Sequence, residues 1–280
     1  MHILLTGASG FIGRHVLDTL VAAGHRVTAH SRRADLAARP GVGWLHRPLD
    51  EVSAADFAGV DVFMHLASPG VSPRQADWAT LVYWNVTVLQ RLLEHARSAG
   101  VRRHVVAGTF AEFGRAADGL AFIPDDAALQ PTYAYAASKA AGAVMASAYA
   151  IETGLEFCYL RLFSVFGEGQ NAANFWPALR QAARAGHDFE MTAGEQVRDY
   201  LPVENAARAF LGAAERTDVP PGRPWVRNVG SGQPVSMGDF ARRWWDEWQA
   251  PGRLLRGALP YRANEVMRFV PVVDPAVWTW

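Results

Sequence analysis

A tyrosine and a lysine four residues apart are the side chains best placed to do chemistry in this sequence. Tyr135 and Lys139 lie in the stretch Tyr133-Ala-Tyr-Ala-Ala-Ser-Lys139. Residues at i and i+4 share one helix face, so the ammonium can lower the pKa of the phenol. Such a phenol can pass a proton to or from a carbonyl or an alcohol. Tyr133 competes for this role, but only Tyr135 has a lysine four residues later, and we expect Tyr133 to line the pocket.

A glycine-rich loop near the N-terminus, Thr6-Gly-Ala-Ser-Gly-Phe-Ile-Gly13, follows a short apolar run and opens a helical pattern. Its glycines allow a tight turn and a close approach of backbone to a pyrophosphate, and the helix N-terminus offers N–H groups to the phosphates. With the tyrosine–lysine pair, the loop predicts redox chemistry on a carbon–oxygen bond. The residues that we expect to contact the cofactor here are Gly7, Gly10, Phe11, Ile12 and Gly13.

The end of the second predicted strand indicates which dinucleotide binds. An acid there would hydrogen-bond the ribose 2′-hydroxyl of NAD, but the sequence reads His30-Ser-Arg-Arg33. Arg32 and Arg33 can instead hold a 2′-phosphate through bidentate hydrogen bonds. The stretch therefore favours NADP(H). NAD stays open as the alternative, with the arginines then forming a solvated basic turn.

Thr109 ends the predicted strand Arg103–Gly108. Ligands bind at the carboxyl ends of parallel strands, where its hydroxyl could hydrogen-bond the reacting oxygen. A helix or turn cap is the alternative role. The nine histidines show no metal-ligand spacing, and His65 is interpreted as a cofactor-pocket or core residue. We predict no metal site.

Strand and helix patterns alternate along the first part of the chain, which predicts a parallel sheet covered on both faces. The expected strands are His2–Thr6, Arg26–His30, Asp61–Leu66, Arg103–Gly108 and Glu156–Leu162, and the expected helices are Phe11–Ala23, Trp78–Ala99 and Tyr133–Thr153. After residue 167 glycine and proline become more frequent and the helices shorter, namely Asn174–Ala185, Val203–Ala214 and Ser236–Gln249. We therefore expect a cofactor domain over 1–167 and a smaller lobe over 168–280, with 203–235 and its strand Trp225–Val229 returning to the main sheet.

Composition excludes some functions. Lys plus Arg equals Asp plus Glu, so the chain carries no overall basic charge for nucleic acid or an anionic membrane. Cys158 is the single cysteine, so no intrachain disulfide can form, which fits a reducing compartment. It lies in an apolar run and is interpreted as core. No signal peptide is visible, and no apolar run reaches the roughly 18 residues of a membrane span. We expect a cytoplasmic protein.

Taken together, these residues resemble the extended short-chain dehydrogenase/reductases, specifically the NAD(P)-dependent nucleotide-sugar epimerase/dehydratase family. The resemblance runs nearly from end to end. The motifs that carry it are Thr6–Gly13, His65-Leu-Ala67, Asn85, Thr109–Gly114, Tyr135 with Lys139, Arg161–Gly167, Gly194–Asp199 and Asn228–Gly232. The resemblance implies an α/β fold, a Rossmann-type doubly wound parallel sheet with a smaller C-terminal substrate-binding lobe.

The resemblance also implies roles for single residues. Thr109, Tyr135 and Lys139 would be the catalytic trio, with Thr109 and Tyr135 touching the substrate and Lys139 the cofactor ribose. Leu66, Ala67 and Phe163 would lie along the cofactor. The residues implied to contact a nucleotide-diphosphate sugar are Asn174, Arg198 and Arg262. Family members commonly form homodimers through two long helices, which the alanine-rich stretch 134–150 would suit.

Departures from the family pattern narrow the implied function. Sugar 4,6-dehydratases carry an Asp-Glu pair directly after the catalytic threonine, where this chain has Phe110 and Ala111. Pro48 stands where relatives often have an aspartate near the adenine. The stretches 107–114 and 257–262 look most similar to 4-ketoreductases of nucleotide-linked 4-keto-6-deoxyhexoses. The expected activity is therefore NADPH-dependent reduction of such a sugar.

Two other functions stay open at this point. A 4-epimerase would use the same trio with a bound NAD, and the arginines at 32 and 33 argue against it modestly. A regulatory protein that senses NADP would need neither Tyr135 nor Lys139. An RNA-binding role lacks a basic patch in the composition.

Overall fold

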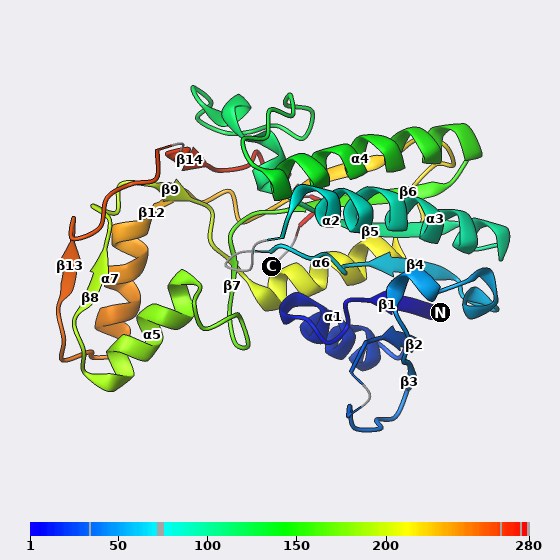
Figure 1. Cartoon of the computed structure of the whole chain (residues 1–280), viewed down its shortest axis with the longest axis horizontal. Helices are drawn as coiled ribbons and strands as arrows, with labels where there is room; N and C mark the ends of the chain where they lie inside the picture. The colour runs from blue at the N-terminus through cyan, green and yellow to red at the C-terminus, as the bar shows by residue number, and fades with distance from the viewer. Residues whose placement is uncertain (34, 72–75, 264, 275, 279–280) are drawn as a thin grey trace.

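The central sheet has seven strands, all parallel, in the order β11-β6-β5-β4-β1-β2-β3 (Figure 1). The computed structural model describes residues 1–33, 35–71, 76–263, 265–274 and 276–278. The strands are β1 (His2–Thr6), β2 (Arg26–His30), β3 (Val42–Leu45), β4 (Val62–His65), β5 (Arg103–Thr109), β6 (Glu156–Leu162) and β11 (Trp225–Val229). The predicted Rossmann-type doubly wound sheet is confirmed.

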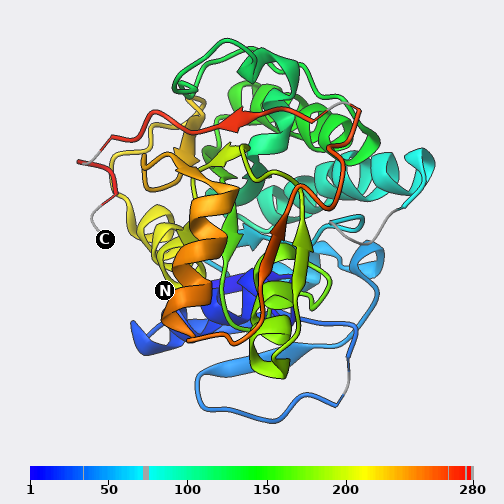
Figure 2. The ribbon, with the colours of Figure 1, turned by 90° about the vertical axis from the view of Figure 1, so that its left-hand side faces the viewer.

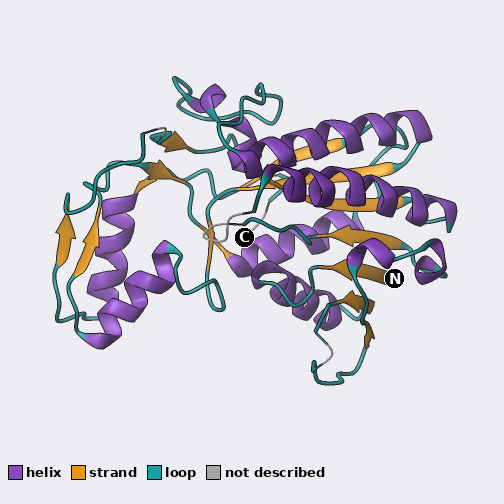
Figure 3. Ribbon diagram, in the orientation of Figure 1, coloured by secondary structure: helices purple, strands orange, loops and turns teal. Residues whose placement is uncertain are grey.

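Helices cover both faces of the sheet (Figures 1 and 3). One face carries α1 (Phe11–Ala22) and α6 (Val203–Glu215). The other carries α4 (Ala134–Thr153) and a continuous helix of α2 (Trp78–Val82), a π-helical segment (Tyr83–Val88) and α3 (Leu89–Ser98). Successive side chains of a strand point to opposite faces, so Ile3 and Leu5 pack with α1 and α6 while Leu4 packs with α3 and α4. Burial on both faces explains why these strands read as unbroken apolar runs.

The π-helical segment is a feature that the helical pattern did not indicate. Asn85 lies within it and is buried. The backbone carbonyl oxygen of Asn85 faces Gly142 of α4, where an added Cβ would lie only 2.3 Å from that oxygen. Glycine at 142 therefore allows the two long helices to approach each other closely beside the sheet.

A smaller set of elements lies beyond the carboxyl ends of the main strands (Figures 1 and 2). Its helices are α5 (Phe175–Ala185) and α7 (Met237–Glu247). Its strands are β7 (Val165–Phe166), β8 (Phe189–Met191), β9 (Val197–Arg198), β10 (Leu201–Pro202), β12 (Val235–Ser236), β13 (Leu254–Arg256) and β14 (Arg268–Phe269). They pair as β10-β7, β12-β9-β14 and β13-β8. Residues 279–280, which end the expected lobe, lie outside the described residues.

Short 3₁₀ turns connect the main elements, at Leu49–Glu51, Ala54–Phe57, Phe110–Phe113 and Arg115–Ala117. Among the described residues, no helix is both long and apolar enough to cross a membrane.

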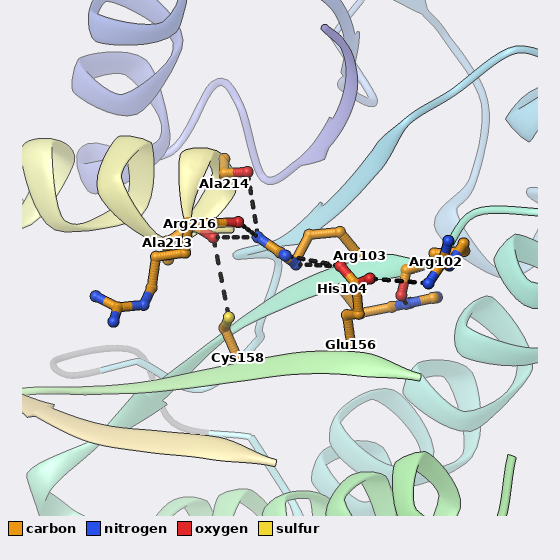
Figure 4. A network of polar contacts seen from close by, with 8 residues as sticks. All are labelled: Arg102, Arg103, His104, Glu156, Cys158, Ala213, Ala214 and Arg216. Atoms are coloured by element: carbon orange, nitrogen blue, oxygen red, sulfur yellow. Dashed lines mark hydrogen bonds and ion pairs between the residues drawn. The ribbon is translucent and has the colours of Figure 1, made fainter. Parts of the chain in front are cut away.

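A buried arginine connects the amino end of β5 to the C-terminus of α6 through hydrogen bonds (Figure 4). The Arg103 guanidinium donates to the carbonyl oxygens of Ala213 and Arg216 at 3.1 and 2.7 Å and to the Glu156 carboxylate at 2.7 Å. These carbonyls have no partner within the helix, so the cation satisfies the helix end. Cys158 packs nearby with its side chain buried, and burial raises the pKa of its thiol to about 12. A thiol held neutral in this way is a core residue, as expected.

Candidate active site

The glycine-rich loop packs directly on the segment that follows β4. Gly7 has φ +75°, and a Cβ there would lie 2.8 Å from the backbone nitrogen of Ala67. A Cβ on Gly13 would lie 2.0 Å from the Gly7 carbonyl oxygen. Only glycine fits either position, and the loop is thereby held against Leu66 and Ala67.

The N-terminus of α1 fits a dinucleotide diphosphate. Gly10 is the N-cap residue, no side chain caps the helix, and no acidic residue lies in the first turn. The first N–H groups of the helix, from Phe11 to Gly13, have no partner within the helix and carry the positive end of its dipole. They are available to phosphate oxygens without competition from a carboxylate.

The two arginines at the end of β2 lie in different surroundings. Arg33 donates to both carboxylate oxygens of Asp35, at 3.0 and 2.9 Å, so its guanidinium is already engaged. Arg32 is exposed, and its side chain makes no hydrogen bond within the described residues. Ser31 is buried, and its hydroxyl lies 3.1 Å from that of Ser9 in the glycine-rich loop. Arg32 is therefore the arginine that is free to bind a ligand.

Lys139 connects α4 to the carboxyl end of β5. Its buried ammonium donates to the Ala107 carbonyl oxygen at 2.7 Å. Burial lowers the pKa of this ammonium, and the negative charge of Glu112 opposes the shift. Tyr135 precedes it by one helical turn, as the spacing predicts.

The expected lowering of the Tyr135 pKa is not found. Burial raises the pKa of this phenol, and the charges of Tyr133 and Glu112 raise it further. A hydrogen bond with Ser68 opposes the shift, but the charge of Lys139 is not among its causes. Lys139 directs its ammonium to a backbone carbonyl, and the phenol is protonated at neutral pH, as a tyrosine with an unshifted pKa would also be.

Thr109 occupies the last position of β5 and begins the turn Phe110–Phe113. Its side-chain oxygen accepts a hydrogen bond from the backbone N–H of Ala111 at 3.3 Å and forms a reciprocal capping box with Glu112. Thr109 therefore caps this turn, which is the alternative role that the sequence left open. Because a hydroxyl that accepts these bonds keeps its own proton, Thr109 can still donate to a substrate oxygen.

A chain of polar contacts behind Tyr135 contains residues that sequence reasoning missed. The Ser68 hydroxyl donates to Asn85 at 2.7 Å, and the Asn85 amide donates to Ser138 at 2.9 Å. Ser138 donates to the backbone carbonyl of Tyr135 at 2.9 Å. The sequence indicates Asn85 only through the motifs that carry the family resemblance. Ser68 and Ser138 had no signal of their own, because their role depends on which helix lies opposite.

The expected substrate residues lie in different surroundings. Arg198 is buried, and its guanidinium donates to Glu265 at 2.7 Å and to the Val266 carbonyl at 2.8 Å. Burial lowers its pKa, and the Glu265 charge opposes the shift. Arg262 is exposed and close enough to Tyr133 for its charge to lower the pKa of that phenol against the larger raising effect of burial.

The rings of Tyr133 and Tyr135 lie 6.4 Å apart, centroid to centroid. The charges of Arg262 and Glu265 both act on the Tyr133 phenol, so these residues lie beside the start of α4, and Glu265 also accepts a hydrogen bond from Arg198. Asn174 is the N-cap of α5 and is half-buried, and its side chain makes no cap hydrogen bond. Among the described residues, no hydrogen bond engages its amide.

Two further expectations concern Phe163 and His65. Phe163 is buried against the rings of Phe110 and Phe113, with centroids 5.7 and 6.4 Å away. His65 is buried with Nδ1 2.8 Å from the Thr6 hydroxyl oxygen, and burial lowers its pKa to about 3, so the imidazole is neutral. Within the described residues, no group of three or more His, Cys, Asp or Glu is placed to hold a metal ion.

Comparison with known proteins identifies a protein family that matches this chain. A model described as the NAD dependent epimerase/dehydratase family matches residues 3–230. The chain is 30% identical over 262 residues to a UDP-glucose 4-epimerase from Corynebacterium glutamicum, covering 85% of this chain and 77% of the relative. It is 30% identical over 251 residues to a dTDP-glucose 4,6-dehydratase from Streptomyces griseus, covering 84% and 75%.

A solved structure, MoeE5 in complex with UDP-glucuronic acid and NAD, superimposes with a TM-score of 0.86 at 28% identity. The match covers 99% of this chain and 92% of that chain. Since the two curated relatives are named for different reactions, similarity alone does not choose between them.

Proposed function

Because the chain belongs to the NAD-dependent epimerase/dehydratase family of extended short-chain dehydrogenase/reductases, we propose a specific reaction within it. The enzyme reduces the 4-keto group of a nucleotide-diphospho-4-keto-6-deoxyhexose with NADPH. When bound, NADPH supplies the hydride to the carbonyl carbon. The residues of the chain bind the two molecules, orient the carbonyl and deliver the proton.

The proton donor in this proposal is the phenol of Tyr135. A reductase needs an acid at the forming alkoxide, and a group whose pKa is raised by burial keeps its proton until that oxygen becomes basic. Tyr135 donates its phenolic proton to the sugar oxygen, and the Thr109 hydroxyl donates a hydrogen bond to the same atom. Lys139 would hold the cofactor ribose. A 4-epimerase would use the same phenol first as a base and then as an acid, so the choice between the two reactions rests on the cofactor and not on Tyr135.

Dehydration is disfavoured by the positions after Thr109. Phe110 packs against Phe163 and Phe269, with ring centroids 5.7 and 4.7 Å away, and Ala111 is buried. Neither position offers a carboxyl group, so the acid–base pair that eliminates water in the dehydratases is missing here.

The observation that carries this proposal is the guanidinium of Arg32, which is exposed, makes no hydrogen bond within the described residues and can pair with the 2′-phosphate of NADPH. The alternative is an NAD-dependent 4-epimerase. It is favoured by the similarity to a UDP-glucose 4-epimerase and by the NAD bound in the MoeE5 structure. A sensor of NADP is less well supported, because it would not need a lysine buried beside Tyr135.

The part of the chain over 168–280 would bind mainly the nucleotide sugar, with 203–235 belonging to the cofactor domain. Arg262 and Arg198 would contact the diphosphate, and Asn174 the same substrate. Arg198 is paired with Glu265 at 2.7 Å, so binding a diphosphate requires that carboxylate to turn away or to take up a hydroxyl of the ligand.

A homodimer is supported by apolar side chains exposed on the two long helices. Val144 and Ile151 of α4 are 62% and 60% exposed, and Trp78 of α2 is 60% exposed. Burying them against a second copy would remove this apolar surface from water.

The proposal is tested by identifying the cofactor and then the substrate. The purified protein is denatured, released nucleotide is identified by mass spectrometry, and the native protein is titrated with NADPH and NADH. An empty site that prefers NADPH, with turnover of one of a panel of 4-keto-6-deoxy nucleotide sugars, is the expected result. Stoichiometric NAD carried through purification, with interconversion of 4-epimers, would establish the epimerase instead.

A further inference from the structure

Glu112 is a carboxylate without exposed surface, three residues after Thr109. Three donors converge on it. Its Oε1 accepts from the backbone N–H of Thr109 and from the Tyr159 hydroxyl, both at 2.8 Å, and its Oε2 accepts from Arg161 Nε at 2.8 Å. Burying a charge is costly unless it is paired and hydrogen-bonded, and both conditions hold here.

The backbone before Thr109 packs closely against this carboxylate. A Cβ on Gly108 would lie 2.3 Å from the Tyr159 ring and 3.0 Å from Glu112 Oε1. The end of β5 therefore lies directly on the Glu112–Tyr159 pair, where only glycine fits. The hydrogen bond from Thr109 N–H then sets the direction in which the chain leaves the strand.

That direction decides what the Thr109 hydroxyl can do. In the capping box, the Thr109 oxygen accepts from backbone N–H groups of the turn while Glu112 returns to the Thr109 N–H. A hydroxyl has two lone pairs and one proton, so accepting these bonds leaves its proton free for another acceptor. Without Glu112, the backbone at Thr109 loses its anchor and the hydroxyl its fixed direction.

We propose that Glu112 is a positioning residue, which holds Thr109 so that its hydroxyl donates to the reacting oxygen of the substrate. The proposal rests on the proposed reduction, in which Thr109 and Tyr135 meet one sugar oxygen. Glu112 has no exposed surface, so it does not touch the substrate and acts through Thr109.

The test needs a variant that removes the carboxylate without leaving Arg161 unpaired. Glu112→Leu/Arg161→Met replaces the buried ion pair by apolar side chains of similar size, a change that proteins often tolerate. Tyr159→Phe is the matched control, because it removes the other donor to Oε1 and leaves the Thr109 N–H bond in place. Melting temperature and NADPH affinity establish that each variant is folded.

Turnover of the keto sugar is then measured in a double-mutant cycle with Thr109→Val. Glu112→Leu/Arg161→Met should lower kcat about 10- to 100-fold with Thr109 present, since misdirecting one oxyanion donor loses most of its effect. With Thr109→Val already in place it should cost less than about threefold, because no hydroxyl is left to misdirect. Equal losses in both backgrounds would show a general structural effect and overturn the proposal.

A second measurement does not depend on the substrate. Hydrogen exchange of the Thr109 amide, followed by NMR in the free protein, should become at least tenfold faster in Glu112→Leu/Arg161→Met and stay unchanged in Tyr159→Phe. An amide that remains protected in the double variant would show that Glu112 does not anchor Thr109. If wild-type protein reduces no keto sugar, the proposed function fails, and the exchange result still decides whether Glu112 is this anchor.

Discussion

Replacing Arg32 with alanine should weaken NADPH binding about 10- to 100-fold and leave NADH binding unchanged. The Arg32 side chain is exposed and makes no hydrogen bond within the described residues, so no internal contact is lost. A charge-assisted hydrogen bond contributes about 1.5–3 kcal/mol, and about 1.4 kcal/mol corresponds to a factor of ten in Kd. Solvent screening at an exposed site places the expected loss near the lower half of that range.

Arg33 provides the matched control. Its guanidinium must leave Asp35, which it contacts at 2.9 and 3.0 Å, before it can bind a phosphate. Arg33→Ala should therefore weaken NADPH binding only about threefold, because the surface ion pair that it gives up offsets part of the gain. Asp35→Asn should act in the opposite sense and tighten NADPH binding, since it frees the second arginine.

The assay is a titration of NADPH and NADH fluorescence on the wild type and the three variants at low and high salt. The NADPH preference of the wild type should shrink as salt rises, because the phosphate contact is electrostatic. Arg32→Ala losing NADPH and NADH affinity equally would refute the reasoning. So would a wild type that binds both dinucleotides alike.

Three further predictions concern catalysis and stability. Tyr135→Phe should lower kcat at least 10²-fold while sparing NADPH affinity, and wild-type-like turnover would remove Tyr135 from the mechanism. The pKa values of His65 and His104 are lowered by burial to about 3 and about 4, so protonation of these residues in the unfolded chain, which begins as pH falls below 6.5, destabilises the fold. Urea unfolding between pH 7.5 and 5 should show this loss. Burial also lowers the pKa of His30, so three histidines contribute, and His104→Leu should reduce the slope by about a third; an unchanged slope would exclude His104. Arg103→Met should lower the free energy of unfolding by about 3 kcal/mol, because carbonyls of α6 and the Glu156 carboxylate lose a buried partner. A loss below about 1 kcal/mol in urea melts would show that water replaces the guanidinium.

The main sheet was predictable because its strands carry a local signal. Strands at His2–Thr6, Arg26–His30, Glu156–Leu162 and Trp225–Val229 begin and end where the apolar pattern indicated. The first three are buried on both faces or nearly so, which leaves an apolar run bounded by polar or turn residues. The edge strand β3 was missed, since Val42–Leu45 is short, contains glycine and is only half-buried.

The small strands of the C-terminal part carry no such signal. Pairs of two or three residues, such as β9 with β12 and β14, form because distant segments of the chain meet there. Residues 197, 235 and 268 are too far apart in the sequence for any local pattern to indicate their pairing. The π-helical segment around Asn85 lies against Gly142 of another helix, a contact between residues too distant in the sequence for a local pattern to indicate.

The sequence by itself determined the identity of the reactive groups: the glycine-rich loop, the Tyr135–Lys139 spacing and the threonine at the end of β5. Such spacing is local, and helix and strand geometry convert it directly into shared faces. Only the tertiary structure decided their electrostatics. Burial raises the Tyr135 pKa although a lysine lies one turn away, and it is the fold that brings Glu112, Tyr159 and Arg161 together behind Thr109. Desolvation and pairing depend on what surrounds a side chain in three dimensions, and that information is absent from the order of residues around it.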